Sequence, residues 1–193
     1  MPIRVIAGTA KGRKLKMVPG DATRPVMDRV KEALFNILGT AVRGCSFLDL
    51  FAGTGSVGIE ALSRGAARAV FIDNNRMAIR TIRENLAHTR LDDRAEVVMT
   101  DAFAYLRRAT PERFECVYVA PPQYRGLWKK ALVALDTNPA RLERDSMVVV
   151  QIDPVEREDV ALAVLEPYDE RVYGNTMLWF FERPALDEDE GGA

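Results

Sequence analysis

The 193-residue chain has little of what marks several classes of protein. Its two cysteines, Cys45 and Cys116, are too few for a disulfide framework and fit a reducing cytoplasm better than a secreted setting. A single histidine and the lack of any Cys-x-x-Cys pair argue against a structural zinc site, so we expect no metal. No apolar run approaches the length of a membrane span, and the start has no apolar segment typical of a signal peptide. We therefore expect one cytoplasmic domain without a membrane contact.

Charge is unevenly distributed, although the net charge is only −1. Residues 1–40 carry eight Lys/Arg and three Asp/Glu, a net of +5, whereas the remaining 153 residues carry 19 and 25, a net of −6. A basic segment on a nearly neutral protein favours a local contact with a polyanion. A solvated charged face is the alternative.

Hydrophobic periodicity predicts alternating strands and helices. After two short strands within residues 4–18 comes an amphipathic helix over 23–38, capped by Thr23 or Asp28 and ended by Gly39. Strands are then expected at 46–53, 69–74, 95–101, 114–120 and 146–153, with helices at 56–65, 76–90, 102–109, 126–135 and 155–165. Residues 168–183 form a hairpin around Gly174–Asn175. Repeated strand–helix units predict a parallel, doubly wound α/β sheet, which binds ligands at the carboxyl ends of its strands.

A glycine-rich turn follows the first of these strands. In LDLFAGTGSVGIE, Gly53, Gly55 and Gly58 match the G-x-G-x-x-G pattern of nucleotide-binding sites. Asp73 comes 20 residues after Gly53, at the end of the next strand, where it could accept hydrogen bonds from a ribose. By itself the pattern leaves a dinucleotide such as NAD, another nucleoside cofactor, or a purely structural turn open.

Charge favours one cofactor over the other. Asp49 lies four residues before Gly53 and would repel the pyrophosphate of NAD. S-adenosylmethionine (AdoMet) has no phosphate, and its ammonium and sulfonium groups are cations that Asp49 would suit. Asp101 closes the third strand, where it could meet the adenine amine. Any one of these acids could instead be a helix cap, but three at successive strand ends indicate one site for a cationic nucleoside.

The stretch VYVAPPQYRGLW follows the fourth strand. Asp/Asn/Ser-Pro-Pro-aromatic at this place is typical of AdoMet enzymes that methylate an exocyclic amine, whose N–H groups are oriented by nearby oxygens. This chain departs from the pattern, because Ala120 has no side-chain acceptor and Gln123 stands where the aromatic is usual. The carbonyls of Ala120 and Pro121 remain available, and Tyr124 could stack on a base. A structural proline turn is the alternative.

Two other chemistries are disfavoured. Methylation at C5 of a pyrimidine needs a thiolate at this strand end, whereas Cys116 lies within the strand. His88 belongs to a predicted surface helix, where a catalytic role is not expected.

The chain resembles the RsmD-type bacterial 16S ribosomal RNA guanine-N2-methyltransferases over about residues 3–183. The matching stretches are RVIAGTAKGRKL, TRPVMDRVKEALFNIL, LDLFAGTGSVGIEALSRGA and YGNTMLWFF. The resemblance implies a Rossmann-like class I methyltransferase fold, with a seven-stranded mostly parallel sheet, a C-terminal antiparallel hairpin and a small N-terminal β-hairpin extension. We expect the extension at 1–20, the AdoMet-binding domain at 21–183 and a disordered acidic tail at 184–193.

The resemblance also implies roles for individual residues. AdoMet would be held by Asp49, Phe51, Gly53, Gly55, Asp73, Asn74, Asp101 and Ala102. The acceptor base would be met by Ala120, Pro121, Pro122 and Tyr124. RNA would be contacted by Arg4, Lys11, Arg13, Lys14, Lys16, Arg24 and Arg29. The family usually has Thr at Val26 and Asp at Ala120.

The function expected on these grounds is methylation of a guanine N2 amine in 16S rRNA by a monomer, acting on the rRNA or on a small-subunit assembly intermediate. Ala120 and Gln123 keep other amine acceptors open, namely adenine N6 or a protein amide. A non-catalytic AdoMet- or RNA-binding protein is a further alternative. An NAD-dependent oxidoreductase is disfavoured by Asp49.

Overall fold

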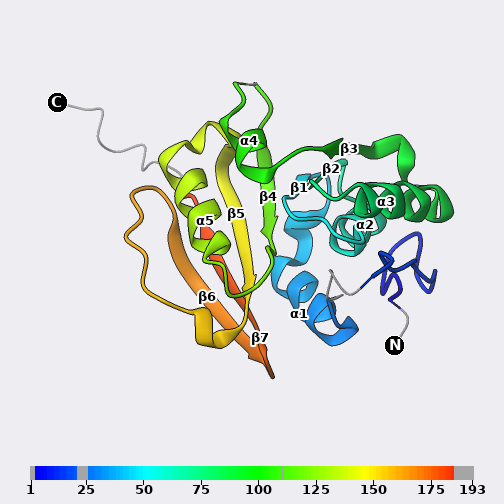
Figure 1. Ribbon diagram of the computed structural model, residues 1–193, viewed down its shortest axis with the longest axis horizontal. Coiled ribbons are helices and arrows are strands. Elements are labelled where there is room, and N and C mark those ends of the chain that lie inside the picture. Colours follow the sequence, from blue (N-terminus) through cyan, green and yellow to red (C-terminus); the bar gives the residue numbers. More distant parts are fainter. Residues whose placement is uncertain (1–2, 21–25, 110, 185–193) are drawn as a thin grey trace.

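The computed structural model describes residues 3–20, 26–109 and 111–184, and a seven-stranded sheet forms its centre (Figure 1). The strand order is β3-β2-β1-β4-β5-β7-β6. The strands are β1 Ser46–Asp49, β2 Arg68–Asp73, β3 Ala95–Met99, β4 Phe114–Val119, β5 Leu142–Ile152, β6 Glu166–Tyr173 and β7 Thr176–Glu182. β1 to β5 are parallel, and β7 runs antiparallel to both β5 and β6. The predicted doubly wound sheet with a C-terminal hairpin is confirmed.

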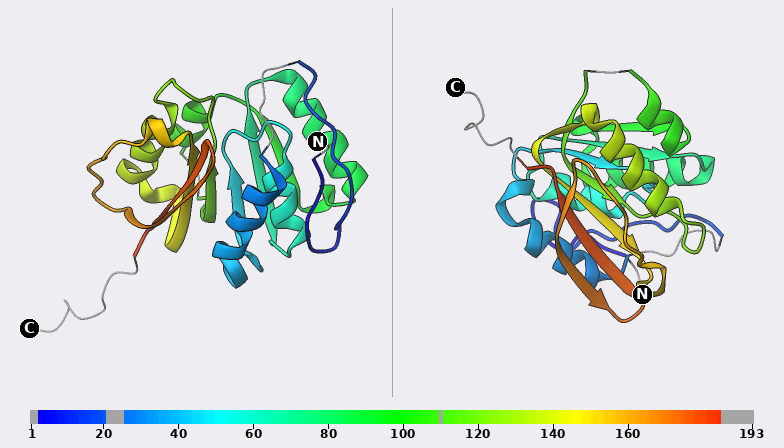
Figure 2. Two further views of the ribbon diagram at one scale, coloured as in Figure 1. Left: turned by 90° about the horizontal axis from the view of Figure 1, so that it is seen from below. Right: turned by 90° about the vertical axis from the view of Figure 1, so that its left-hand side faces the viewer.

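Helices cover both faces of this sheet (Figure 2). The helices are α1 Asp28–Leu38, α2 Ser56–Ser63, α3 Arg76–Thr89, α4 Ala102–Arg107 and α5 Leu127–Thr137. Alternate residues of a strand point to opposite faces, so Phe47 packs with α1, α2 and α3 while its neighbour Leu48 packs with α4 and α5. None of the described helices is long and apolar enough to cross a membrane.

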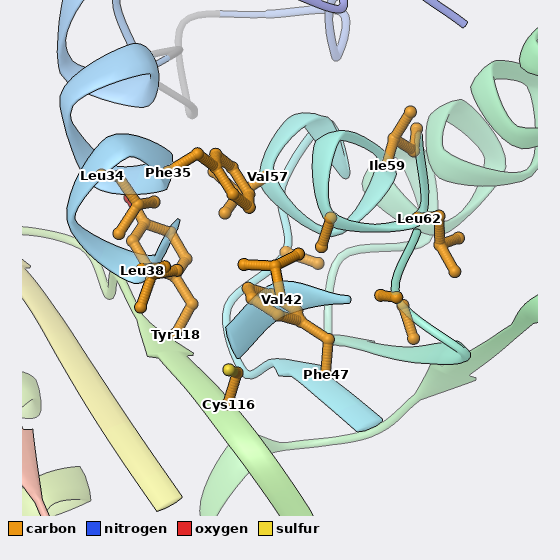
Figure 3. Close-up of a cluster of buried hydrophobic side chains, with 14 of the residues drawn as sticks. Leu34, Phe35, Leu38, Val42, Phe47, Val57, Ile59, Leu62, Cys116 and Tyr118 are labelled. Atoms are coloured by element: carbon orange, nitrogen blue, oxygen red, sulfur yellow. The ribbon is translucent and has the colours of Figure 1, made fainter. Parts of the chain in front are cut away.

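The core under α1 and α2 brings together parts of the chain that are far apart in sequence (Figure 3). Leu34 and Leu38 of α1 lie near Tyr118 of β4, and Phe35 stacks against Phe47 of β1 with ring centroids 6.4 Å apart. Burying each such side chain contributes about 1.5–3 kcal/mol. This packing fixes α1 and α2 on the sheet beside the carboxyl ends of β1 and β4.

Residues 3–20, which we call the strap, double back beside α2 and α3 (Figure 1). The two strands expected here are reduced to one antiparallel bridge between Arg4 and Lys14. Backbone hydrogen bonds still join the two arms, since Val5 donates to Arg13 at 2.9 Å and Leu15 donates to Ile3 at 2.8 Å. In the loop between the arms, the amides of Ile6 and Ala7 donate to the Glu60 carboxylate at 2.8 and 2.9 Å. Apolar strap side chains join the main core, namely Ile3, Val5, Ala10 and Leu15.

Gly8 shows how closely the strap approaches α2. Its φ is +81°, and a Cβ added there would lie 1.8 Å from the backbone oxygen of Ser63. The neighbouring amides of Thr9 and Ala10 bond the Ser63 carbonyl and hydroxyl at 2.9 and 3.0 Å. Only glycine fits this contact.

The helix predicted over 155–165 is absent. A short 3₁₀ turn, η4 Pro154–Glu156, follows β5, and irregular chain then leads to β6. Here the Asp136 carboxylate of α5 accepts the amides of Ala163, Val164 and Leu165, each at 2.8 Å. Burial alone would raise the pKa of Asp136, but these three hydrogen bonds together lower it. A distant carboxylate therefore takes the amides that a helix would have used.

The expected ends of α1 are partly corrected. Met27, without a side-chain hydrogen bond, occupies the N-cap, and Asp28 lies inside the first turn, where it pairs with Arg4 at 2.9 Å. Thr23 lies outside the described residues. Gly39 ends the helix as predicted, with φ +54°.

Candidate cofactor and acceptor site

The candidate site lies where the strand order reverses. β1 has β2 on one side and β4 on the other, so Asp49 is paired with Phe71 and with Tyr118. The glycine-rich loop after β1 and the Pro121–Pro122 turn after β4 therefore leave the sheet side by side. Crevices at such reversal points are where open α/β sheets bind ligands.

The glycine-rich loop turns sharply from β1 into α2. Gly53 and Gly55 have φ of +54° and +75°, and Gly55 is the N-cap of α2. Gly58 serves packing instead, because a Cβ there would lie 2.3 Å from the Phe71 ring. The loop conformation thus depends on glycine at its first two positions, and the helix–strand contact depends on the third.

Asp49 is buried at the end of β1, with 2% of its surface exposed. Its Oδ2 accepts the Gly58 amide at 3.1 Å. Burial, together with a smaller effect of nearby Asp73, raises its pKa to about 7, although the Gly58 hydrogen bond acts in the opposite direction. A cation beside Asp49 would stabilise its charged form, so the residue suits a positively charged ligand.

Asp73 fastens the glycine-rich loop to the start of α3. Its Oδ2 accepts the Gly53 amide and its Oδ1 accepts the Asn75 amide, both at 2.8 Å. Asn75 in turn caps α3 by accepting from the amides of Met77 and Ala78. Asn74 is exposed between them.

Asp101 performs the capping role that the sequence left open. Its Oδ1 accepts the Ala104 amide at 2.9 Å at the start of α4, and its residue is exposed. The Thr100 amide donates to the Asp73 carbonyl at 3.1 Å, which keeps this strand end beside that of β2. Ala102 is buried in the first turn of α4.

The segment after β4 forms an exposed turn next to the glycine-rich loop. Pro121 is buried, while Ala120 is half-buried and Pro122 is exposed. Tyr124 is 67% exposed and has φ +61°, which is uncommon for a residue with a side chain. A left-handed tyrosine needs support from its surroundings.

That support comes from two acids that the sequence reading missed, Asp153 and Glu156. The Tyr124 hydroxyl donates to Asp153 Oδ2 at 2.6 Å, and the Tyr124 amide donates to Glu156 Oε1 at 2.8 Å. Asp153 follows β5 directly, is 8% exposed and caps η4 through the Val155 amide. The rule applied to the other strand ends would have found Asp153.

The residues expected at RNA lie in two places. At α1, the strap residue Arg4 pairs with Asp28, and Arg29 in the first turn of the helix has its guanidinium 5.8 Å from the centre of the Tyr173 ring. Lys11, Arg13, Lys14 and Lys16 lie on the strap. Arg24 lies outside the described residues.

The two cysteines have no place in the candidate site. Cys45 and Cys116 are buried free thiols, and the contact with Cys45 together with burial raises the pKa of Cys116. A thiol so disposed is a poor nucleophile. No group of three or more His, Cys, Asp or Glu suited to a metal occurs among the described residues.

Comparison with known proteins identifies the family of the chain. Residues 3–182 match the family model described as "Conserved hypothetical protein 95". The chain is 33% identical over 189 residues to Ribosomal RNA small subunit methyltransferase D of Escherichia coli K12, covering 97% of this chain and 93% of that protein. The chain therefore belongs to the family that includes Ribosomal RNA small subunit methyltransferase D. The resemblance to RsmD-type proteins is thereby confirmed.

This chain is similar in sequence or in fold to further proteins. It is 42% identical to the putative rRNA methyltransferase YlbH of Bacillus subtilis over 153 residues, which covers 78% of this chain and 83% of that protein. The structure of the putative methyltransferase yhhF from Escherichia coli superposes with a TM-score of 0.83 at 35% identity, covering 96% of this chain and all of that one. An RNA methyltransferase from Salinibacter ruber, solved with S-adenosyl-L-homocysteine, shares the fold, with a TM-score of 0.65 at 18% identity over 86% of this chain and 98% of that one.

The charges of the candidate site indicate which cofactor it can bind. Asp49 and Asp73 lie at the glycine-rich loop, and Asp153 lies behind the turn after β4. Such a set attracts cations and repels pyrophosphate. The residues present therefore fit a cationic, phosphate-free nucleoside such as AdoMet.

Proposed function

We propose that this chain transfers the methyl group of AdoMet to the N2 amine of a guanine in 16S rRNA of the small ribosomal subunit. The observation that carries the proposal is the glycine-rich loop and the Pro121–Pro122 turn leaving adjacent strands β1 and β4. The names of its relatives support methylation of rRNA. The match to the Escherichia coli K12 protein covers nearly the whole of both chains, which supports the same activity for this chain.

On this proposal the cofactor lies along the carboxyl ends of β1, β2 and β3. AdoMet would supply a methyl group whose bond to sulfur breaks as the bond to the guanine nitrogen forms, which would leave neutral S-adenosylhomocysteine and release one amine proton to solvent. Asp49 and the backbone of Gly53 and Gly55 hold the methionyl part, while Asp73 binds the ribose through lone pairs left over from its two amide contacts. Phe51, Asn74, Asp101 and Ala102 surround the adenosine.

The acceptor guanine enters at the turn after β4 as a flipped base. Its N1–H and N2 amine are donors, and the carbonyls of Ala120 and Pro121 accept from them. Tyr124 stacks on the base, a role consistent with its exposed ring and its hydrogen bond to Asp153. The acidic acceptor missing at Ala120 is thus replaced by backbone carbonyls, with Asp153 fixing the turn.

The RNA partner is 16S rRNA or a small-subunit assembly intermediate, which the protein binds as a monomer in the cytoplasm. The strap cations and the arginines at 24 and 29 contact its phosphates, which position the substrate without reading its sequence.

Labelled AdoMet tests the proposal directly. The protein is incubated with small subunits that lack the modification, the RNA is digested, and the labelled nucleoside is identified. We expect N2-methylguanosine, and Asp73→Ala should suppress the label by weakening AdoMet binding. Label in N6-methyladenosine or in protein would contradict guanine as the acceptor. It would identify one of the other acceptors that Ala120 and Gln123 leave open. Bound AdoMet with no label in RNA or protein would instead make the chain a binding protein.

A further inference from the structure

The outward surface of α3 is rich in arginine. Four arginines are exposed on this helix or at its C-cap, namely Arg76, Arg80, Arg83 and Arg90. Among the described residues, only Arg80 of these four has an ion pair, which it makes with Glu84. Arg76, Arg80 and Arg83 follow one another at helical spacings of four and three, so they share one side over about 10 Å.

The strap places further cations beside this helix. The Lys16 ammonium pairs with Glu84 at 2.9 Å, and Arg13 donates to the His88 carbonyl near the end of α3. Lys11 and Lys14 are exposed on the strap and have no ion pair among the residues described. We call this joint surface the basic face; its cations are Lys11, Arg13, Lys14, Lys16, Arg76, Arg80, Arg83 and Arg90.

Acids offset only part of these charges: Asp92 and Glu96 line the same hollow as Arg83, and Glu84 lies on the helix itself. The only acidic residue of α3 is Glu84, which bridges Lys16 and Arg80 and whose pKa is lowered by its hydrogen bonds to them. The basic face therefore keeps a large excess of positive charge. A surface on which like charges are gathered attracts a polyanion over long distances.

The backbone that carries these cations is fixed. Asn85 is fully buried; its Oδ1 accepts the Lys16 amide at 2.7 Å, and its Nδ2 donates to the carbonyls of Lys16 and Thr54 at 3.1 and 3.0 Å. Gly8 is held against Ser63 at the other end of the strap. The cations thus project from a rigid support, which reduces the ordering that binding would require.

We propose that the basic face binds the phosphate backbone of the RNA that flanks the target base. α3 begins at Arg76, just after Asp73 and Asn75 at the candidate site, and its 14 residues extend about 21 Å away from it. RNA that follows this helix would run from the acceptor turn toward the strap. The proposal rests on the proposed function for the identity of the RNA, and it adds α3 to the strap as one continuous docking surface.

The test removes charge from α3 and leaves the strap and the candidate site intact. In the triple variant Arg76→Gln, Arg80→Gln and Arg83→Gln, glutamine keeps a good helix propensity at three exposed positions. Binding to 16S rRNA transcribed in vitro is measured from 50 to 300 mM salt without AdoMet. We expect the slope of log K against log salt to become shallower by roughly 2–3, because each lost phosphate contact contributes about 0.7–0.9.

A matched control separates a local surface from overall charge. Arg43→Gln, Arg107→Gln and Arg144→Gln remove the same charge from exposed positions outside the basic face. This control should keep the wild-type slope. Both triple variants should bind AdoMet with wild-type affinity in calorimetry, and with modification-deficient small subunits as substrate the α3 variant should raise KM while kcat at saturation stays unchanged.

The outcomes distinguish this inference from the proposed function. An unchanged slope in the α3 variant, or an equal fall in the control, would contradict RNA binding by the basic face. An unchanged slope is also what we would expect if α3 bound an acidic protein instead of RNA. RNA binding that depends on α3 in a protein that methylates no rRNA would support the basic face and contradict the proposed function.

Discussion

At the scale of single residues, Asp49 combines a buried position with a raised pKa of about 7. A carboxyl whose pKa is raised by folding contributes stability that is present below its unfolded value near 3.8 and is lost as pH rises through about 7. Asp49→Asn keeps an oxygen for the Gly58 amide and cannot ionise. We expect the variant to be more stable than wild type at pH 8 by roughly 4 kcal/mol, because the pKa rises from 3.8 to about 7 and each pKa unit corresponds to about 1.4 kcal/mol.

Urea unfolding at pH 8 and near pH 4 measures this effect. The two proteins should converge at the lower pH, where Asp49 is protonated. AdoMet affinity should be weaker in the variant, and wild-type affinity should rise with pH through about 7 because the cation favours the ionised carboxyl. Equal stability of the two proteins at pH 8 would contradict the raised pKa.

Tyr124 and Asp153 should act as a unit in positioning the acceptor. Tyr124→Phe keeps the ring but loses the hydroxyl that donates to Asp153. A hydrogen bond to a charged partner contributes about 1.5–3 kcal/mol, so we expect kcat/KM on modification-deficient small subunits to fall roughly tenfold or more. Asp153→Ala should cause a similar loss, and the double variant little further loss.

Calorimetry with AdoMet is the control for this cycle, since the pair lies on the acceptor side and cofactor affinity should not change. Asp153→Asn keeps an oxygen for the tyrosine and should retain more activity than Asp153→Ala. Fully additive losses would mean that the two residues act separately.

At the scale of elements, Asn85 connects α3, the strap and the glycine-rich loop through Lys16 and Thr54. Asn85→Ala leaves a buried amide and two carbonyls without their partner, which costs about 1–3 kcal/mol for each unsatisfied group. We expect a lower melting temperature together with weaker binding of both AdoMet and RNA. His88→Gln, at an exposed position of the same helix, is the control. A loss of stability without any effect on either ligand would limit Asn85 to packing.

Elements were predictable where the signal is local. The apolar runs of β1, β2 and β4 and the Gly174 turn of the β6–β7 hairpin could be recognised because period and turn chemistry depend on adjacent residues. Residues 155–165 have a helical pattern, yet their amides bond Asp136 of α5. The hydrogen bonds to a carboxylate more than 25 positions away outweighed the local preference.

At the scale of the whole molecule, the strap is part of the core as well as of the charged surface. Ile3, Val5 and Leu15 are buried in the same core cluster as residues of α1, α2 and α3. The Lys31 ammonium, itself fully buried, donates to the Arg4 carbonyl at 2.6 Å. Deletion of residues 1–20 should therefore remove roughly 5 kcal/mol or more of apolar burial, a large share of the stability of a single domain.

Melting temperature and AdoMet binding of the shortened chain test this expectation. We expect the truncated protein to be unfolded or strongly destabilised, whereas Lys11→Gln with Lys14→Gln should melt like wild type and lose only RNA affinity. A truncated chain that melts like wild type would make residues 1–20 a separable extension.

The sequence by itself determined the doubly wound sheet, the glycine-rich loop and the acids at three strand ends, because each of these depends on residues within one element or turn. The contacts of Asp153 and Glu156 with Tyr124, and the position of the strap against α3, became visible only in the folded molecule. The physical reason is that a carboxylate binds whichever donor the packing brings to it. The partners of Tyr124 lie 29 and 32 positions further along the chain, and Lys16 and its partner Glu84 are 68 positions apart. A pattern of neighbouring residues cannot indicate contacts over such separations.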